Sequence, residues 1–124
     1  MNFPKYPSII NLHKATDILN YKCVVTEKIH GTNVRFMWSS KNGGLVLGSR
    51  ENVIFKDGQR SGELYGFTEF MSNHPVLEKF HNSAEFDDYV FYGEFFGSSI
   101  QKGVKYCEGK QLRIFDVLVD DKLL

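Results

Sequence analysis

The strongest constraint on the fold is the stretch 89–97 (YVFYGEFFG), which carries apolar residues on both of its faces. A strand of this kind is expected in the interior of a sheet, because both faces need packing partners. By alternation, Glu94 shares a face with Val90, Tyr92 and Phe96. A carboxylate on such a strand is costly unless it is hydrogen-bonded or paired. Its partner is therefore expected to be either a buried Arg or Lys, or the hydroxyl groups of a ligand.

The rest of the chain predicts an α+β fold in which antiparallel strands form hairpins and helices are inserted between them. Alternating or β-branched patterns predict strands over 21–29, 33–39, 45–49 and 112–119. Turn residues predict reversals at 42–44 and 56–59. Apolar residues at helical spacing predict one or two helices between 62 and 82, interrupted at Pro75, and a further short helix over 15–20.

Composition limits the function classes. The chain has 124 residues, enough for one domain, and 15 basic residues balance 15 acidic ones. Zero net charge excludes a histone-like polycation, so that any contact with nucleic acid requires a local patch. The only cysteines, Cys23 and Cys107, have no zinc-type spacing and are typical of a reducing compartment. We find no apolar run that could span a bilayer and no signal peptide.

Three short segments carry polar groups that are unusual for a plain sheet. Residues 27–33 (EKIHGTN) place Lys28 between two predicted strands, Arg50 follows a strand end, and Phe115 precedes an aspartate inside the last predicted strand. Each has an ordinary explanation: a solvated strand end for Lys28, a turn for His30-Gly31-Thr32, and a core position for Phe115. Their combination with Glu94 favours a functional site.

Together these segments resemble the motifs of the ATP-dependent RNA ligases, which are covalent nucleotidyltransferases related to DNA ligases and capping enzymes. Residues 27–33 match the nucleophile motif, Lys-x-x-Gly in general and Lys-x-His-Gly in the double-strand-type ligases of phages and of kinetoplastid RNA editing. The segments 49–50, 92–97 and 114–117 resemble the next motifs in the family's order. Residues 5–11 resemble the group's N-terminal segment. The likeness covers about residues 3–119.

The resemblance implies a nucleotidyltransferase fold, similar to ATP-grasp proteins, with antiparallel sheets flanked by helices and a nucleotide between the sheets. It also implies a mechanism in which the motif lysine attacks the α-phosphorus of ATP and forms lysyl-AMP, with Mg²⁺ as the metal. The AMP then passes to an RNA 5′-phosphate, and a 3′-hydroxyl seals the strand. RNA ends or a nicked RNA duplex are the implied partners.

By resemblance, Lys28 is the nucleophile, Glu94 holds a ribose hydroxyl, and Phe115 stacks on adenine. The further residues implied in nucleotide or RNA contacts are Glu27, Ile29, His30, Gly31, Asn33 and Arg50. Capping enzymes and DNA ligases usually carry Asp at the position of His30, which disfavours both. No metal ligands are assigned.

The proposed chemistry makes a demand on Lys28. Only a neutral amine is nucleophilic, and at a reference pKa near 10.4 only about one lysine in 2,500 is neutral at pH 7. Partial desolvation and a nearby cation both favour the neutral form. The neighbouring Glu27 would oppose this if it faced Lys28, but adjacent residues of a strand point to opposite sides.

Two later motifs of the family do not occur, namely a Glu-Gly-apolar segment and a Lys-x-Lys pair that grips the α-phosphate. Residues 108–110 (EGK) resemble the first only superficially and are expected to form a turn. We therefore expect residues 1–124 to be a partial, truncated adenylation domain without a C-terminal domain, impaired in catalysis, with strand edges that could promote self-association. The alternatives are a non-catalytic nucleotide- or RNA-binding module, and a DNA ligase or capping relative. The expected location is cytoplasmic, including the cytoplasm of a phage-infected host, or mitochondrial for a kinetoplastid protein.

Overall fold

The structure is a computed structural model that describes residues 2–8, 20, 22, 31–97, 100 and 109–124. Its strands and helices, in chain order, are β1 (Thr32–Ser39), a 3-10 turn η3 (Ser40–Asn42), β2 (Gly44–Ser49), β3 (Val53–Lys56), β4 (Gln59–Arg60), α1 (Phe67–Ser72), α2 (Val76–Asn82), β5 (Val90–Gly97), β6 (Lys110–Val119) and β7 (Lys122–Leu123). The described part is a small α+β domain, as the sequence predicted.

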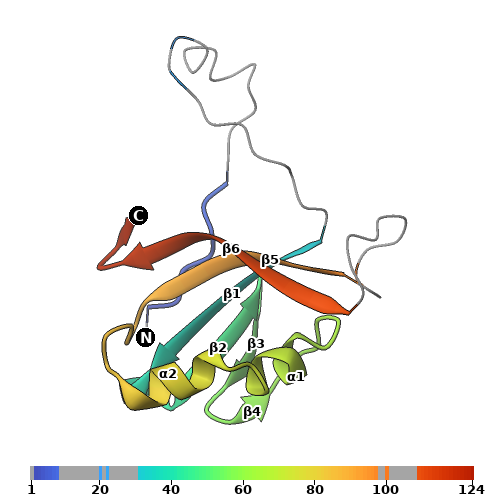
Figure 1. Cartoon of the computed structure of the whole chain (residues 1–124), viewed down its shortest axis with the longest axis vertical. Coiled ribbons are helices and arrows are strands. Elements are labelled where there is room, and N and C mark those ends of the chain that lie inside the picture. The colour runs from blue at the N-terminus through green and yellow to red at the C-terminus, as the bar shows by residue number, and fades with distance from the viewer. Residues whose placement is uncertain (1, 9–19, 21, 23–30, 98–99, 101–108) are drawn as a thin grey trace.

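Within the described residues, the strands form one seven-stranded sheet in the order β4-β3-β2-β1-β5-β6-β7, shown in Figure 1. Every pairing is antiparallel. The prediction of an interior strand over 89–97 is confirmed, since β5 lies between β1 and β6. Two stacked sheets with a nucleotide between them remain an expectation, because the predicted strand over 21–29 lies outside the described residues except for Lys22.

One face of the sheet packs against α1 and α2, which lie in front of it in Figure 1. The alternation of β1 supplies this core with Val34 and Phe36, and β5 supplies Phe95. The other buried members are Leu45, Leu47, Ile54, Phe67, Met71, Phe80 and Ile100. Aromatic rings dominate the contacts; Phe36 stacks on Phe91 at 5.0 Å between centroids. This face is therefore an apolar core without room for charged site residues.

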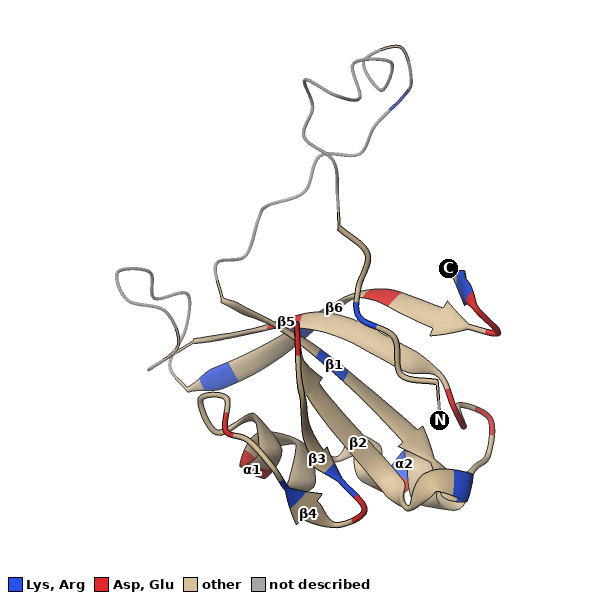
Figure 2. Cartoon of the chain, turned by 180° about the vertical axis from the view of Figure 1, so that it is seen from behind, with Lys and Arg blue, Asp and Glu red and all other residues tan. Residues whose placement is uncertain are grey.

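The opposite face is partly covered by the N-terminal segment 2–8, which lies in front of the sheet in Figure 2. Phe3 packs in a second cluster with Met37, Val46, Val90 and Tyr92. The Tyr92 hydroxyl donates a 2.7 Å hydrogen bond to the carbonyl oxygen of Pro4. The N-terminal segment is thus a structural cover for part of this face.

Arg35, on β1, binds the same N-terminal segment. Its guanidinium donates to the carbonyl oxygens of Phe3 at 2.6 Å and Ser49 at 3.1 Å, and lies 4.4 Å from the centre of the Phe3 ring. Gly48 makes room for it, because a Cβ there would lie 2.6 Å from Arg35 Nε. Burial lowers the pKa of Arg35, but an arginine starts so high that it stays charged.

The two helices are confirmed, but α1 begins later than the helical spacing from residue 63 suggested. Tyr65 and Gly66 both have positive φ values, 50° and 79°, and a helix cannot continue through them. The Glu63 carboxylate instead accepts hydrogen bonds from the backbone N–H groups of Leu64 and Gly66. A side chain that satisfies nearby backbone donors in this way competes with the helix.

Pro75 separates the helices as predicted and immediately precedes α2. The hairpin turns at 42–44 and 56–59 are also confirmed, the first containing η3 and a left-handed Gly43. Three short strands were not predicted, namely β3 and β4 on either side of the second turn, and β7. At β7, Asp120 and Asp121 adopt φ values of 49° and 66°, and the chain turns back onto β6. Aspartate tolerates this conformation better than most residues, but two in succession are an unusual turn signal.

The edges of the described sheet are only partly covered. The outermost strands, β4 and β7, have two residues each, and β7 pairs with the last two residues of β6, so that within the described part residues 110–116 of β6 have no strand on their outer side. Self-association through strand edges therefore stays a prediction. Separately, none of the helices in the described ranges is long and apolar enough to cross a membrane.

The hydrogen bond from Tyr92 predicts a measurable role for the N-terminal cover. Tyr92→Phe removes the hydroxyl and leaves the Pro4 carbonyl without this donor, so we expect unfolding free energy to fall by about 1 kcal/mol. Urea unfolding followed by the fluorescence of Trp38 measures it. The control is Tyr65→Phe on a side chain that is 46% exposed; equal midpoints for the two variants would contradict the prediction.

A second prediction concerns pH. The Asp87 carboxylate accepts hydrogen bonds from Ser40 Oγ at 2.6 Å and Ser40 N at 2.9 Å, and these bonds lower the pKa of Asp87 from its usual 3.8. A lowered folded-state pKa contributes stability above the unfolded value, and this contribution is lost as the pH falls through the folded value. We expect Asp87→Asn to destabilise the domain at pH 7 by less than about 1 kcal/mol, since the site is solvent-screened.

The difference between wild type and Asp87→Asn should disappear as the pH falls below 3.8. Thermal melts across the pH range test this. Glu85→Gln, the same chemical change two residues earlier, serves as the control. A difference that persisted unchanged into acid would show that the Ser40 contacts do not depend on the charge of Asp87.

Candidate active site

Gly31 locates one end of the predicted nucleophile motif. It directly precedes β1, and a Cβ at this position would overlap the carbonyl oxygen of Phe95 and lie 2.8 Å from the Cβ of Phe96. Only glycine permits this approach of the backbone to β5. The motif therefore ends at Gly31, against the strand that carries Glu94. Gly31 follows Lys28 by three residues, and three residues of extended chain span at most about 11 Å.

Asn33 and Glu94 are direct cross-strand neighbours in the β1–β5 ladder. Side chains of directly opposed residues lie on the same face, with Cβ atoms about 5 Å apart. The face is the one that the N-terminal segment partly covers, because the flanking Val34 and Phe95 belong to the helix-side core. Both side chains are partly exposed. The structure thus brings together two predicted site residues that are far apart in sequence.

Arg50 directly follows β2. The last pair of the β1–β2 ladder is Val34 with Ser49, so that Arg50 lies just beyond the ladder, at the end of the sheet where Asn33 stands on β1. Its side chain is exposed. Ser49 Oγ accepts a 3.0 Å hydrogen bond from the backbone N–H of Asn52, which holds the tight reversal that contains Arg50.

Phe115 occupies an irregular position in β6. The register shifts between Tyr92 and Gly93, which pair with Asp116 and Ile114, so that Phe115 is the extra residue of a bulge. A bulge re-aims side chains, and here the ring of Phe115 meets the ring of Tyr6 edge-on at 5.1 Å. Phe115 is 47% exposed. A large aromatic ring half open to solvent can stack on a planar ligand, whereas a core phenylalanine could not.

The contacts that support Phe115 were not predicted and come from the N-terminal segment. Tyr6 donates a 2.8 Å hydrogen bond to Asp116 Oδ2 and packs 5.1 Å from the ring of Tyr92. Burial, and then the hydrogen bond to Asp116, raise the pKa of Tyr6. Burial likewise raises the pKa of Tyr92, with Arg35 opposing. Both phenols therefore stay protonated donors at neutral pH, and both anchor the N-terminal segment beside Phe115.

Four predicted residues lie outside the described ones: Glu27, Lys28, Ile29 and His30. The described ones are Gly31, Asn33, Arg50, Glu94 and Phe115, and all lie on, or at the end of, strands β1, β2, β5 and β6. No group of three or more His, Cys, Asp or Glu residues within the described ranges is arranged to hold a metal ion. Of the turn predicted over 108–110, Gly109 has a φ of 74°, which is typical of a turn, whereas Lys110 already begins β6 and Glu108 lies outside the described residues.

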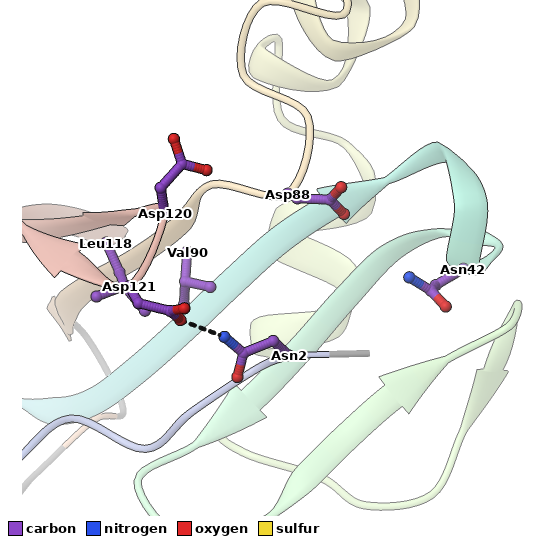
Figure 3. A pocket seen from close by; sticks show the side chains of 7 residues that line it. All are labelled: Asn2, Asn42, Asp88, Val90, Leu118, Asp120 and Asp121. Atoms are coloured by element: carbon purple, nitrogen blue, oxygen red, sulfur yellow. Dashed lines mark hydrogen bonds between the residues drawn. The ribbon is translucent and has the colours of Figure 1, made fainter.

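Two hollows of the described surface lie away from these residues. A pocket of about 260 Å³, drawn in Figure 3, is lined by Asn2, Asn42, Asp88, Val90, Leu118, Asp120 and Asp121. It lies at the Val90–Leu118 end of the face, four residues along β5 from Glu94. Figure 2 shows acidic residues in the β6–β7 turn beside it. We place the candidate site at the motif residues because they carry suitable chemistry, whereas this pocket's lining is acidic and would repel a nucleotide.

Another hollow, of about 440 Å³, lies beside α1 and includes Phe70, His74 and Lys110. Its polar groups are largely used within the protein. His74 Nδ1 accepts a hydrogen bond from the backbone N–H of Val76, and Lys110 donates to the carbonyl oxygen of Tyr65. It shares no residue with the motifs.

The described geometry is that of one sheet face carrying a glycine-pinned motif end, a carboxylate, an exposed arginine and a half-open aromatic ring. A protein-family model described as RNA ligase matches residues 21–123 of the chain. This match covers most of the 124 residues and includes every predicted site residue. The chain therefore belongs to the RNA ligase family.

The contact of Gly31 with β5 predicts a large cost for a small change. Gly31→Ala forces a methyl group into backbone atoms of Phe95 that cannot move aside as a flexible side chain would, so we expect a loss of about 1–3 kcal/mol of stability. Thermal or urea unfolding measures it.

The control is Gly58→Asn, at a glycine with φ of 73° and no atom within 4 Å of the added Cβ. Asparagine tolerates this conformation, so the control should change stability by less than 1 kcal/mol, in line with typical surface substitutions of about 0.5 kcal/mol. If both variants were equally stable, the close approach of Gly31 to β5 would be wrong.

Proposed function

We propose that this protein is an ATP-dependent RNA ligase module of the double-strand type, which forms lysyl-AMP at Lys28 and transfers the AMP to RNA ends. The observation that carries the proposal is the meeting of Asn33, Glu94, Arg50 and Phe115 on one sheet face, next to Gly31, in a chain of the RNA ligase family. The Lys-x-His-Gly form of residues 28–31 supports the double-strand type.

The proposed first step is a displacement at phosphorus. The neutral Nζ of Lys28 attacks the α-phosphorus of ATP, an N–P bond forms, the bond to the bridging oxygen of pyrophosphate breaks, and the amine loses a proton. In the second step an oxygen of an RNA 5′-phosphate takes the AMP from Lys28. In the third, a 3′-hydroxyl oxygen attacks that 5′-phosphorus and AMP leaves.

The described residues fit the binding of an adenine nucleotide. Glu94, as a carboxylate, can accept hydrogen bonds from ribose hydroxyls, and bonds to a charged group contribute about 1.5–3 kcal/mol. Phe115 offers a face to the base, and stacking on an aromatic side chain contributes about 1–3 kcal/mol per base. Arg50 can contact the ribose or the RNA end, and Asn33 lies beside Glu94, where the reactive ends would meet. His30 near the phosphates, and the backbone around Glu27 and Ile29 near the adenine edge, complete the proposal.

Magnesium would enter the proposed site bound to the substrate. Mg²⁺ in nucleotide sites is held mainly by phosphates, waters and one or two carboxylates. When bound, it neutralises phosphate charge and favours the neutral form of a nearby amine. The chain's own task is to orient the nucleotide and to partly desolvate Lys28.

The decisive experiment uses ATP labelled at the α-phosphate. With Mg²⁺, we expect the protein to acquire acid-labile label slowly, because the Lys-x-Lys pair that grips the α-phosphate does not occur in it, and Lys28→Ala to abolish the label. Lys22→Ala removes an exposed lysine six residues earlier and should keep the wild-type rate of labelling. Label on Lys28→Ala would overturn the proposal, and so would a wild-type protein that stays unlabelled after long incubation at high protein concentration.

The same assay separates the alternatives. A non-catalytic module binds ATP or RNA without acquiring label, and a capping relative acquires it from GTP. Nicked duplexes with RNA or DNA at the 3′-end distinguish an RNA ligase from a DNA ligase. We expect Glu94→Gln to reduce labelling about 10- to 150-fold, and Phe115→Ala to act mainly by raising the KM for ATP, since stacking is lost in the ground state too.

A further inference from the structure

The row of residues that contains Asn33 and Glu94 continues onto β6. The β5–β6 ladder pairs Glu94 with Arg113, so that Asn33, Glu94 and Arg113 lie side by side on the adjacent strands β1, β5 and β6. Arg50 directly follows the end of β2, at the Asn33 end of this row. We call these four residues the polar row. At about 4.8 Å between strands, its three ladder residues span about 10 Å.

Arg113 lies on the same face as Glu94. Its neighbour Leu112 packs against the helix-side core, and residues that alternate along a strand point to opposite faces. Two residues further along β6, Phe115 contacts Tyr6 on the open side of the sheet. Arg113 is therefore next to the proposed nucleotide, between the carboxylate and the stacking ring.

The guanidinium of Arg113 is available for a ligand. The ion pairs among the described residues join Lys5 to Glu51 and Arg60 to Glu63, and in this part of the chain no hydrogen bond of the Arg113 side chain is found. The side chain is exposed. Glu94 stands opposite Arg113 in the ladder, but no ion pair joins the two among the described contacts.

An arginine beside Glu94 can offset the negative charge of that carboxylate. Glu94 in the middle of the polar row repels every phosphate that approaches the ribose it is proposed to hold. Cations on both sides offset that repulsion. Arginine suits this role, because its planar fork of N–H donors binds phosphate oxygens in pairs. Arg50 supplies a cation on one side of Glu94, and Arg113 supplies one on the other.

We infer that Arg113 binds a phosphate of the substrate, and specifically the 5′-phosphate of the RNA strand, on the β6 side of Glu94. This inference rests on the proposed function for its substrate class, but its test measures RNA binding and does not require lysyl-AMP to form. Phosphate could also come from the triphosphate of ATP, and the experiment has a separate arm for each source.

The experiment compares oligoribonucleotide duplexes that are nicked and carry either a 5′-phosphate or a 5′-hydroxyl at the nick, with binding followed by fluorescence anisotropy. For the wild type we expect tighter binding of the phosphorylated nick. Arg113→Ala should weaken that binding roughly three- to tenfold and lower the slope of log Kd against log salt by about 0.9, as expected for one lost phosphate contact on a duplex. The preference for the 5′-phosphate should also fall, and Arg113→Lys should restore part of the affinity.

Lys41→Ala is the matched control. It removes one positive charge at the 3-10 turn η3, at the far end of β1 from Asn33, and should leave the 5′-phosphate preference unchanged. The ATP arm measures how Arg113→Ala changes the binding of ATP alone.

A loss of ATP binding with an intact 5′-phosphate preference would overturn the assignment to RNA in favour of the triphosphate. If the Arg113→Ala variant bound both RNA duplexes and ATP as tightly as the wild type does, the phosphate contact itself would be overturned. The two proposals can fail separately. If no lysyl-AMP formed but the preference for the 5′-phosphate still depended on Arg113, the ligase mechanism would be refuted and this inference would stand.

Discussion

The antiparallel pairing of β1 with β5 is the constraint on which the described structure depends. Its register sets Thr32 against Phe95 and Met37 against Val90, and thereby divides the side chains of both strands between two faces. One face receives the phenylalanines that pack under α1 and α2. The other receives Asn33 and Glu94 at one end and Met37 and Val90 at the other. A slip of one residue would exchange these sets and place the carboxylate in the aromatic core.

The N-terminal segment divides the open face into a covered and an uncovered half. Phe3 and the Arg35 guanidinium close the apolar end, and Tyr6 stands at the boundary, bonded to Asp116 and in contact with Phe115. A ligand at the uncovered end would therefore contact the polar row on one side and the aromatic rings of Phe115 and Tyr6 on the other. Rigid strands hold both, which suits a site that must align reacting groups closely.

Much of this arrangement was predictable from local patterns. The interior position of β5 follows from its two apolar faces, the hairpins from glycine and asparagine, and the helix break from Pro75. Predictions failed where a side chain or an unusual backbone conformation competed with periodicity. Glu63 and the left-handed Tyr65 and Gly66 delay the start of α1, and two consecutive left-handed aspartates create β7. The roles of Lys28, Glu27, Ile29 and His30 stay predictions, since these residues lie outside the described ones.

The α+β class, the family and the candidate residues follow from the order of residues alone, because periodicity and motif order are local properties of the chain. Which of these residues lie next to one another depends on the folded arrangement of the strands. Asn33 and Glu94 become neighbours through a ladder between distant segments, a bulge turns Phe115 toward Tyr6, and the register adds Arg113, which no motif indicated. Strand register and bulges arise from packing across the whole sheet, and the order of residues along one strand does not contain that information.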